Sequence, residues 1–145
     1  SVLTKGKYLG IDFNPRYINH AKKVYQENEN RKFLCADANT AAIANSSYEV
    51  ALLIDATHHL SDQENRALLK TLNRIASKFI IICDPIKQSR VNLVGRLLTA
   101  LDRGYYIRSK DEILNLIKES FAIEKVINLK MMGIESICVI AKPKK

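Results

Sequence analysis

Residues 50–55 read VALLID, and this stretch decides the class of fold. Its five apolar residues follow one another without alternating with polar ones, as expected for a parallel strand covered on both faces. Asp55 ends the stretch. Residues 79–85 read FIIICDP and repeat the pattern, with Asp84 followed by a proline that stops the strand. Both stretches therefore predict buried strands of a parallel sheet, each ending in an acid.

Outward from these strands, strand-like and helical segments alternate. Residues 7–12 and 32–37 are further short strands, which end in Asp12 and Asp37. Pro15 suits the first turn of a helix, and the sequences SDQE at 61–64 and SKDE at 109–112 are capping boxes that begin two more. This alternation predicts an α/β, doubly wound (Rossmann-like) sheet that is mostly parallel.

The end of the chain modifies that prediction. Residues 123–130 and 134–141 form two more strand-like stretches, and the link between them is only three residues long. A link this short joins antiparallel strands. We therefore expect a C-terminal antiparallel hairpin at the edge of the sheet.

Length and composition set the broad class. The 145 residues fit a single domain spanning 1–145. Lys and Arg number 23 against 15 Asp and Glu, which gives a net charge of +8, but the basic residues are scattered and favour solvated helix faces over a nucleic-acid surface. The three cysteines lie in apolar runs, typical of free thiols in a cytoplasmic protein. No apolar stretch approaches the ~20 residues that span a bilayer, so we predict no transmembrane segment.

The strand-end acids are candidate ligand-binding residues. In open α/β sheets, ligands bind outside the carboxyl ends of the strands. A carboxylate placed like Asp12 can accept both hydroxyls of a ribose, and one placed like Asp37 can accept from an exocyclic amine such as that of adenine. Asp also ends strands because it favours turns. Because Asp12 and Asp37 occur together in this topology, a ligand-binding role is favoured over a role in turns alone.

At this point the sequence resembles the class I S-adenosylmethionine (SAM)-dependent methyltransferases. The resemblance rests on four stretches and the closing hairpin, which together span nearly the whole chain. The stretches are YLGIDFNP at 8–15, FLCADA at 33–38, YEVALLIDATHHL at 48–60 and FIIICDP at 79–85.

The resemblance implies SAM as the cofactor and a role for each matching residue. Asp12 would bind the ribose hydroxyls, Phe13 would pack on the adenine, and Asp37 would accept from the adenine amine with Ala38 beside it. Ile54 and Asp55 would line the methionine end of SAM.

One part of the family pattern has no counterpart. The family begins with a strand and a glycine-rich loop, whereas this sequence starts with SVLT, so we expect an N-terminally incomplete domain whose first strand and helix are missing. That strand would lie between the strands that end in Asp12 and Asp55. Three explanations are open: a longer natural chain, a segment without a fixed position, or a second copy that completes the sheet in a homo-oligomer.

His58 and His59 lie between a strand end and a capped helix, at the expected mouth of the pocket. A neutral imidazole there can act as a general base on a hydroxyl or amine, so both are candidate catalytic residues. The alternative is that one packs locally and the other faces solvent. With Asp55 they form no recognised metal-ligand spacing, and we predict no metal site.

Residues 102–108 read DRGYYIR and link two predicted helices near the same mouth. Arg108 can hold a carboxylate or phosphate of the acceptor, and Tyr105 or Tyr106 can cover its apolar part. The alternative is a connector whose tyrosines anchor to the core. The amphipathic helix of residues 91–101 is compatible with a lid or a contact with an anionic membrane, although a core-packing helix is favoured.

These observations favour a methyltransferase that moves a methyl group from SAM to a small-molecule or lipid-like acceptor. A short-chain, NAD(P)-dependent dehydrogenase is a second hypothesis, because Tyr106 and Lys110 have the spacing Tyr-x-x-x-Lys. The capping box opposes it, since it starts the helix at Lys110 and leaves Tyr106 outside. A non-catalytic basic binding module is the third, but no basic stripe with interleaved aromatic residues supports it.

Overall fold

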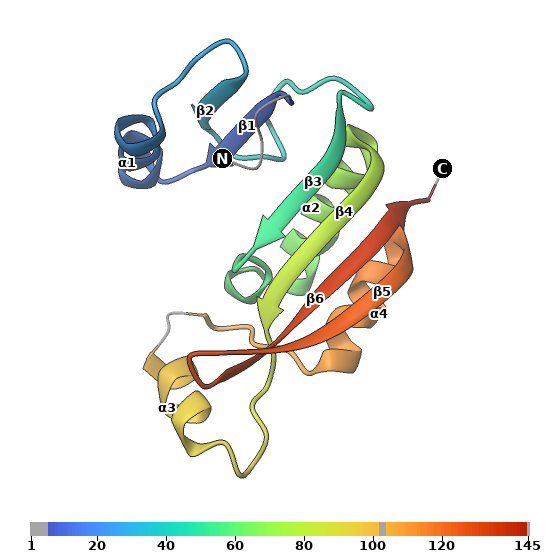
Figure 1. Ribbon diagram of the computed structural model, residues 1–145. Coiled ribbons are helices and arrows are strands. Elements are labelled where there is room, and N and C mark those ends of the chain that lie inside the picture. Colours follow the sequence, from blue (N-terminus) through green and yellow to red (C-terminus); the bar gives the residue numbers. More distant parts are fainter. Residues whose placement is uncertain (1–5, 102–103, 145) are drawn as a thin grey trace. The chain divides into compact units, whose positions relative to one another are not determined.

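The computed structural model describes residues 6–101 and 104–144 and divides the chain into two compact units, residues 1–42 and 43–145. The first unit holds β1 (Tyr8–Asp12), α1 (Pro15–Tyr25) and β2 (Arg31–Cys35), shown in blue in Figure 1. The two strands pair in parallel. That both units form one domain stays a prediction.

Local sequence explains the first unit. The side chain of Asn14 caps α1 by accepting from the N–H of Arg16, and Pro15 takes the first helical position. Gly10 lets β1 approach β2 closely, because a Cβ at this position would lie 2.8 Å from the ring of Phe33. The result is a β–α–β unit whose strands end at the same edge.

The second unit is a four-stranded mixed sheet in the order β3-β4-β6-β5. Its strands are β3 (Tyr48–Ile54), β4 (Ala76–Pro85), β5 (Phe121–Met131) and β6 (Ile134–Pro143). β3 and β4 are parallel, whereas β6 runs antiparallel to both β4 and β5. The predicted C-terminal hairpin is therefore confirmed.

The hairpin turn has a clear local cause. Met132 and Gly133 form the two-residue loop, with φ angles of 49° and 88°. Two consecutive positive φ values are what tight turns between twisted antiparallel strands require.

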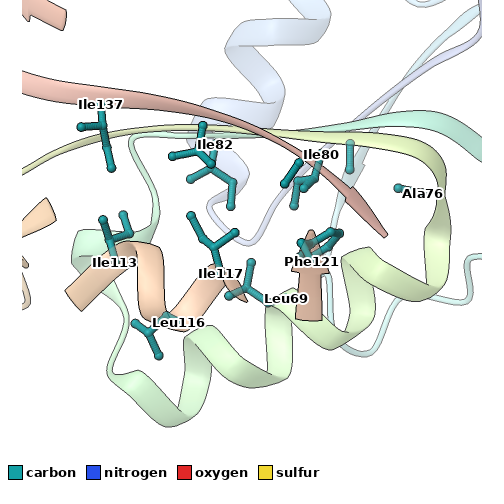
Figure 2. Close-up of a cluster of buried hydrophobic side chains, with 12 residues drawn as sticks. Leu69, Ala76, Ile80, Ile82, Ile113, Leu116, Ile117, Phe121 and Ile137 are labelled. Carbon is teal, nitrogen blue, oxygen red and sulfur yellow. The ribbon is translucent and has the colours of Figure 1, made fainter. Parts of the chain in front are cut away.

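Helices α2 (Asp62–Ile75) and α4 (Lys110–Ser120) bury one face of this sheet. Figure 2 shows Leu69 of α2 and Ile117 of α4 against Ile80 and Ile82 of β4. Both helices begin at the predicted capping boxes, in which the serine and glutamate side chains each bond the other's backbone. The remaining helices are the short 3₁₀ turn η1 (Thr57–His59) and α3 (Leu93–Leu101).

Within the described residues, no strand pairing joins β1 to β3. The expected strand between them stays a prediction. None of the described helices is long and apolar enough to cross a bilayer.

Candidate functional site

In the first unit, the two predicted adenosine-binding acids lie at the same edge of the sheet. Asp12 ends β1 and is in register with Cys35, the last residue of β2, while Asp37 follows two residues later. The Oδ1 atom of Asp12 accepts the N–H of Asn14 at 2.7 Å. The Oδ1 atom of Asp37 accepts the N–H of Asn39 at 2.8 Å. These short-range turns orient each carboxylate through one oxygen.

Phe13 follows Asp12, and 80% of its surface is exposed. Ala38 follows Asp37 and is half-buried. An exposed aromatic ring and two oriented carboxylates at one strand edge match the chemistry of an adenosine, which offers a flat face, two vicinal hydroxyls and an amine. The residues of this edge therefore fit the cofactor that the sequence predicted.

In the second unit, Ile54 ends β3 and Asp55 follows it, and both are exposed. Asp55 has a φ of 49°, a left-handed conformation that Asp tolerates better than most residues. Its N–H donates to the carbonyl of Cys83 at 2.9 Å, which fixes the turn to the neighbouring strand. The chain then enters η1.

Asp84 of β4 organises the start of η1. It is 1% exposed, and its Oδ2 atom accepts the N–H groups of Ala56 at 3.1 Å and Thr57 at 2.8 Å. The distance from its Oδ1 atom to Nδ1 of His58 is 2.6 Å. In neutral His58 this contact fixes the proton on Nδ1, because a carboxylate only accepts.

The two adjacent histidines have different surroundings. His58 is 3% exposed, and a Cβ placed on Gly104 would lie 2.3 Å from its Cδ2 atom. His59 is exposed, and its ring lies against that of His58 with 4.0 Å between centroids. Of the two predicted catalytic residues, only His59 is therefore accessible to an acceptor, while His58 belongs to the support of η1.

Arg108 is 8% exposed and makes five hydrogen bonds. Two go to Oδ1 of Asp62, at 2.9 and 2.7 Å. The other three go to the carbonyl oxygens of Thr57 (2.9 Å), Tyr106 (3.1 Å) and Leu60 (2.8 Å). A guanidinium has five N–H groups, so these contacts use its full donor capacity. A role of Arg108 in holding the acceptor stays a prediction, and the structure gives it internal partners.

The predicted substrate-binding tyrosines lie on the same connector. Tyr105 is 87% exposed, and Tyr106 is 45% exposed. The N–H of Tyr106 donates to the carbonyl of His58 at 3.0 Å, which ties the connector to η1. Asp102 and Arg103 of this predicted linker lie outside the described residues.

Asn65 is a further member of the network that the sequence did not reveal. It is 1% exposed, and its Nδ2 donates to the carbonyls of Thr57, Leu60 and Ser61 at 2.9–3.2 Å. An Asn inside an amphipathic helix gave no signal for this role. Asp84 was visible as a strand-end acid, but nothing local indicated its partner. Among the described residues, no group of three His, Cys, Asp or Glu side chains is arranged to hold a metal ion.

A family model described as a methyltransferase domain matches residues 2–78, which is more than half of the chain. No curated protein matches the sequence significantly.

Several solved structures share the fold at low sequence identity. A SAM-dependent methyltransferase from Methanosarcina mazei is 16% identical, with a TM-score of 0.72 over 93% of this chain and 81% of that one. Magnesium protoporphyrin IX methyltransferase from Synechocystis, solved with S-adenosylhomocysteine (SAH), is 17% identical, with a TM-score of 0.70 over 95% and 64%.

A methyltransferase from Haloferax volcanii, solved in complex with the Trm112 activator, is 11% identical, with a TM-score of 0.76 over 97% and 72%. With the family match and the shared fold in hand, we conclude that the chain belongs to the class I SAM-dependent methyltransferase domain family.

Proposed function

We propose that this chain binds SAM and transfers its methyl group to a small-molecule or lipid-like acceptor. The observation that carries the proposal is the edge of the first unit, where Asp12 and Asp37 follow two paired strands and the exposed Phe13 comes directly after Asp12. In this proposal, Asp12 accepts from the ribose hydroxyls, Phe13 stacks on the adenine, and Asp37 accepts from the adenine amine beside Ala38.

The second unit supplies the acceptor side. Bound SAM would contribute a methyl group on a sulfonium, which is already a strong leaving group, so alignment does most of the work. In this proposal Ile54 and Asp55 would line the methionine end of SAM, and Tyr105 and Tyr106, which are exposed, would offer apolar area with hydroxyl tips to the acceptor. His59 accepts the proton of an acceptor hydroxyl or amine.

His58 and Asp84 act as positioning residues in this proposal. Their contact and the bonds from Asp84 to the backbone hold η1, and His59 is carried on η1. His59→Gln is therefore expected to lower kcat and to leave the unfolding midpoint unchanged, because a glutamine does not accept a proton there. His58→Asn is expected to lower kcat and the unfolding midpoint together, because it changes the contact that holds η1.

Calorimetry with SAH tests the cofactor half without knowledge of the acceptor. Asp12→Asn is expected to weaken SAH binding about tenfold or more, because hydrogen bonds to a charged group contribute roughly 1.5–3 kcal/mol. Asp111→Asn is the matched control, since Asp111 is an exposed carboxylate in the first turn of α4. Equal affinities for the two variants would refute the assignment of Asp12.

The dehydrogenase hypothesis has no support in the structure. Ser109 caps α4 and Lys110 is its first residue, so Tyr106 lies outside the helix. The pair therefore does not share one helical face.

A further inference from the structure

Helix α3 presents its apolar side to solvent. Its large apolar residues Leu93, Val94, Leu97 and Leu101 are each 62–73% exposed. A helix on the surface of a globular protein normally turns such a stripe toward the core. The expectation that residues 91–101 form a core-packing helix is therefore wrong for these side chains.

The opposite side of α3 explains this orientation. A Cβ on Gly95 would lie 2.7 Å from the carbonyl oxygen of Gly133, so the helix backbone sits close to the hairpin turn. Asn92, just before the helix, donates to the same carbonyl at 2.8 Å and accepts the N–H of Gly95 at 3.0 Å. Small and polar groups thus anchor α3. Leu98 is half-buried, and the other large apolar residues, Leu93, Val94, Leu97 and Leu101, are left on the outside.

The hairpin turn extends the exposed apolar surface. α3 and the turn between β5 and β6 lie side by side in the lower part of Figure 1, as the bonds of Asn92 require. Met131, the last residue of β5, and Met132 of the turn are 64% and 92% exposed, and Val91 before the helix is 89% exposed. We call these three residues and the four of α3 the α3 patch. Their exposure makes the patch unlike the scattered apolar residues of an ordinary surface.

Positive charge borders the α3 patch. Residues 86–101 contain Lys87, Arg90 and Arg96 and no Asp or Glu. These three side chains, with Gln88 and Thr99, line an open groove against α3. Lys87 forms an ion pair with Glu112 at 3.0 Å, whereas neither arginine pairs with a carboxylate among the described residues. The groove thus offers two guanidinium groups that no described carboxylate pairs with, beside an apolar helix.

We propose that the α3 patch docks onto the surface of an anionic phospholipid bilayer. The protruding methionines, valines and leucines enter the boundary of the acyl chains, while Arg90 and Arg96 contact the headgroup phosphates. Apolar side chains flanked by basic ones are the composition that binds such an interface. A second copy of the chain is a poorer occupant, because it would bring the same arginines together without an acid in the segment.

Tryptophan fluorescence tests whether the apolar residues of the α3 patch enter the bilayer, because the chain contains no Trp of its own. Leu97→Trp places one probe at the centre of the patch, and Val24→Trp places a matched probe on α1, where Val24 is 52% exposed. Vesicles of equal parts phosphatidylcholine and phosphatidylglycerol are expected to shift the emission of the Leu97→Trp variant to the blue. Brominated lipids are expected to quench the probe in the patch and leave the emission of the Val24→Trp variant unchanged. Equal responses of the two probes would refute the docking orientation.

Co-sedimentation with the same vesicles tests whether the arginines beside the α3 patch contribute to binding. Arg96→Gln is expected to weaken binding about fivefold, since a basic residue near an anionic surface contributes about 1 kcal/mol. Leu97→Glu is expected to weaken it at least tenfold, and both variants should fold because the two side chains are exposed. Arg16→Gln, an exposed arginine at the start of α1, is the control for net charge.

Three other outcomes would overturn the proposal. One is binding that Arg16→Gln weakens as much as Arg96→Gln, which would indicate attraction by net charge alone. Another is binding of inorganic phosphate with no sedimentation on vesicles. The third is a dimer in light scattering that Leu97→Glu dissociates, with no affinity for vesicles, which would assign the patch to a second copy.

Discussion

Replacing Arg108 by Met tests whether the buried guanidinium holds the segment that carries His59. The substitution keeps an apolar stem and removes all five hydrogen bonds. The two bonds to Asp62 count little, because that carboxylate is 58% exposed and exposed ion pairs contribute about 0–1 kcal/mol. The bonds to backbone carbonyls contribute about 0.5–1.5 kcal/mol each.

The loss of Arg108 should cost less than the sum of its bonds, because some of its acceptors have a second donor. The carbonyls of Thr57 and Leu60 also accept from Nδ2 of Asn65, so they keep a partner when Arg108 is replaced. The carbonyl of Tyr106 loses its bond to Arg108, and the carbonyls of Thr57 and Leu60 each lose one of their donors. Together these losses give an expected destabilisation of about 2 kcal/mol. Arg66→Met is the matched control, since Arg66 is 45% exposed and its hydrogen bonds within the described residues go to Glu119, and it should destabilise less than Arg108→Met.

The shared carbonyls make the double mutant informative. In Arg108→Met with Asn65→Ala, the carbonyl of Leu60 loses both side-chain donors, whereas the carbonyl of Thr57 keeps the N–H of Leu60 at 3.2 Å, and an unsatisfied buried carbonyl costs about 1–3 kcal/mol. The double mutant should therefore be less stable than the sum of the singles by at least about 1 kcal/mol, measured by urea unfolding followed by circular dichroism. Strict additivity would refute the shared-acceptor reasoning. So would a destabilisation by Arg108→Met no larger than that of the control.

Further outcomes follow from other contacts. Gly95→Ala should destabilise the fold by about 1–3 kcal/mol in urea unfolding, because its Cβ would collide with the hairpin turn; an unchanged midpoint would contradict the close approach. Hydrogen bonds from the Ser109 backbone and from neighbouring side chains lower the pKa of Glu112 from 4.5 to about 2, so its stabilising contribution is present above pH 4.5 and lost as the pH falls toward 2. Glu112→Gln should make the free energy of unfolding depend less on pH over that interval, and an unchanged pH dependence would contradict the prediction. Burial and the neighbouring thiol raise the pKa of Cys83 to about 12, so Ellman's reagent at pH 8 should modify exposed Cys35 first; the reverse order would contradict that environment.

The sheet and the helix starts could be predicted because their causes are local. Unbroken apolar runs predicted β3 and β4, and the two Ser-x-x-Glu sequences predicted the starts of α2 and α4. The short link before Ile134 predicted the antiparallel hairpin. Each of these signals acts within a few residues, which is the range that a sequence pattern reports.

The support of the candidate site could not be predicted in the same way. Arg108 bonds residues that lie 46–51 positions earlier in the chain, and Asp84 bonds His58 across 26 positions. The sequence indicated that Asp84 and Arg108 lie near the carboxyl ends of the strands, but it did not indicate which residues they bond. The orientation of α3 had the same limit, because periodicity predicts an apolar stripe and does not say what faces it.

His58 and His59 are adjacent, but the structure gives them different roles to test: His59 is exposed to an acceptor, and His58 helps to hold η1. A 3₁₀ helix turns by about one third of a circle per residue, so adjacent residues in η1 face different surroundings. One imidazole is therefore held by Asp84 while the next is exposed. Changes to Asp84 or Arg108 should lower stability and activity together, because they release η1. Changes to His59 should lower activity alone. That separation would identify His59 as the residue that meets the acceptor, and Asp84 and Arg108 as its support.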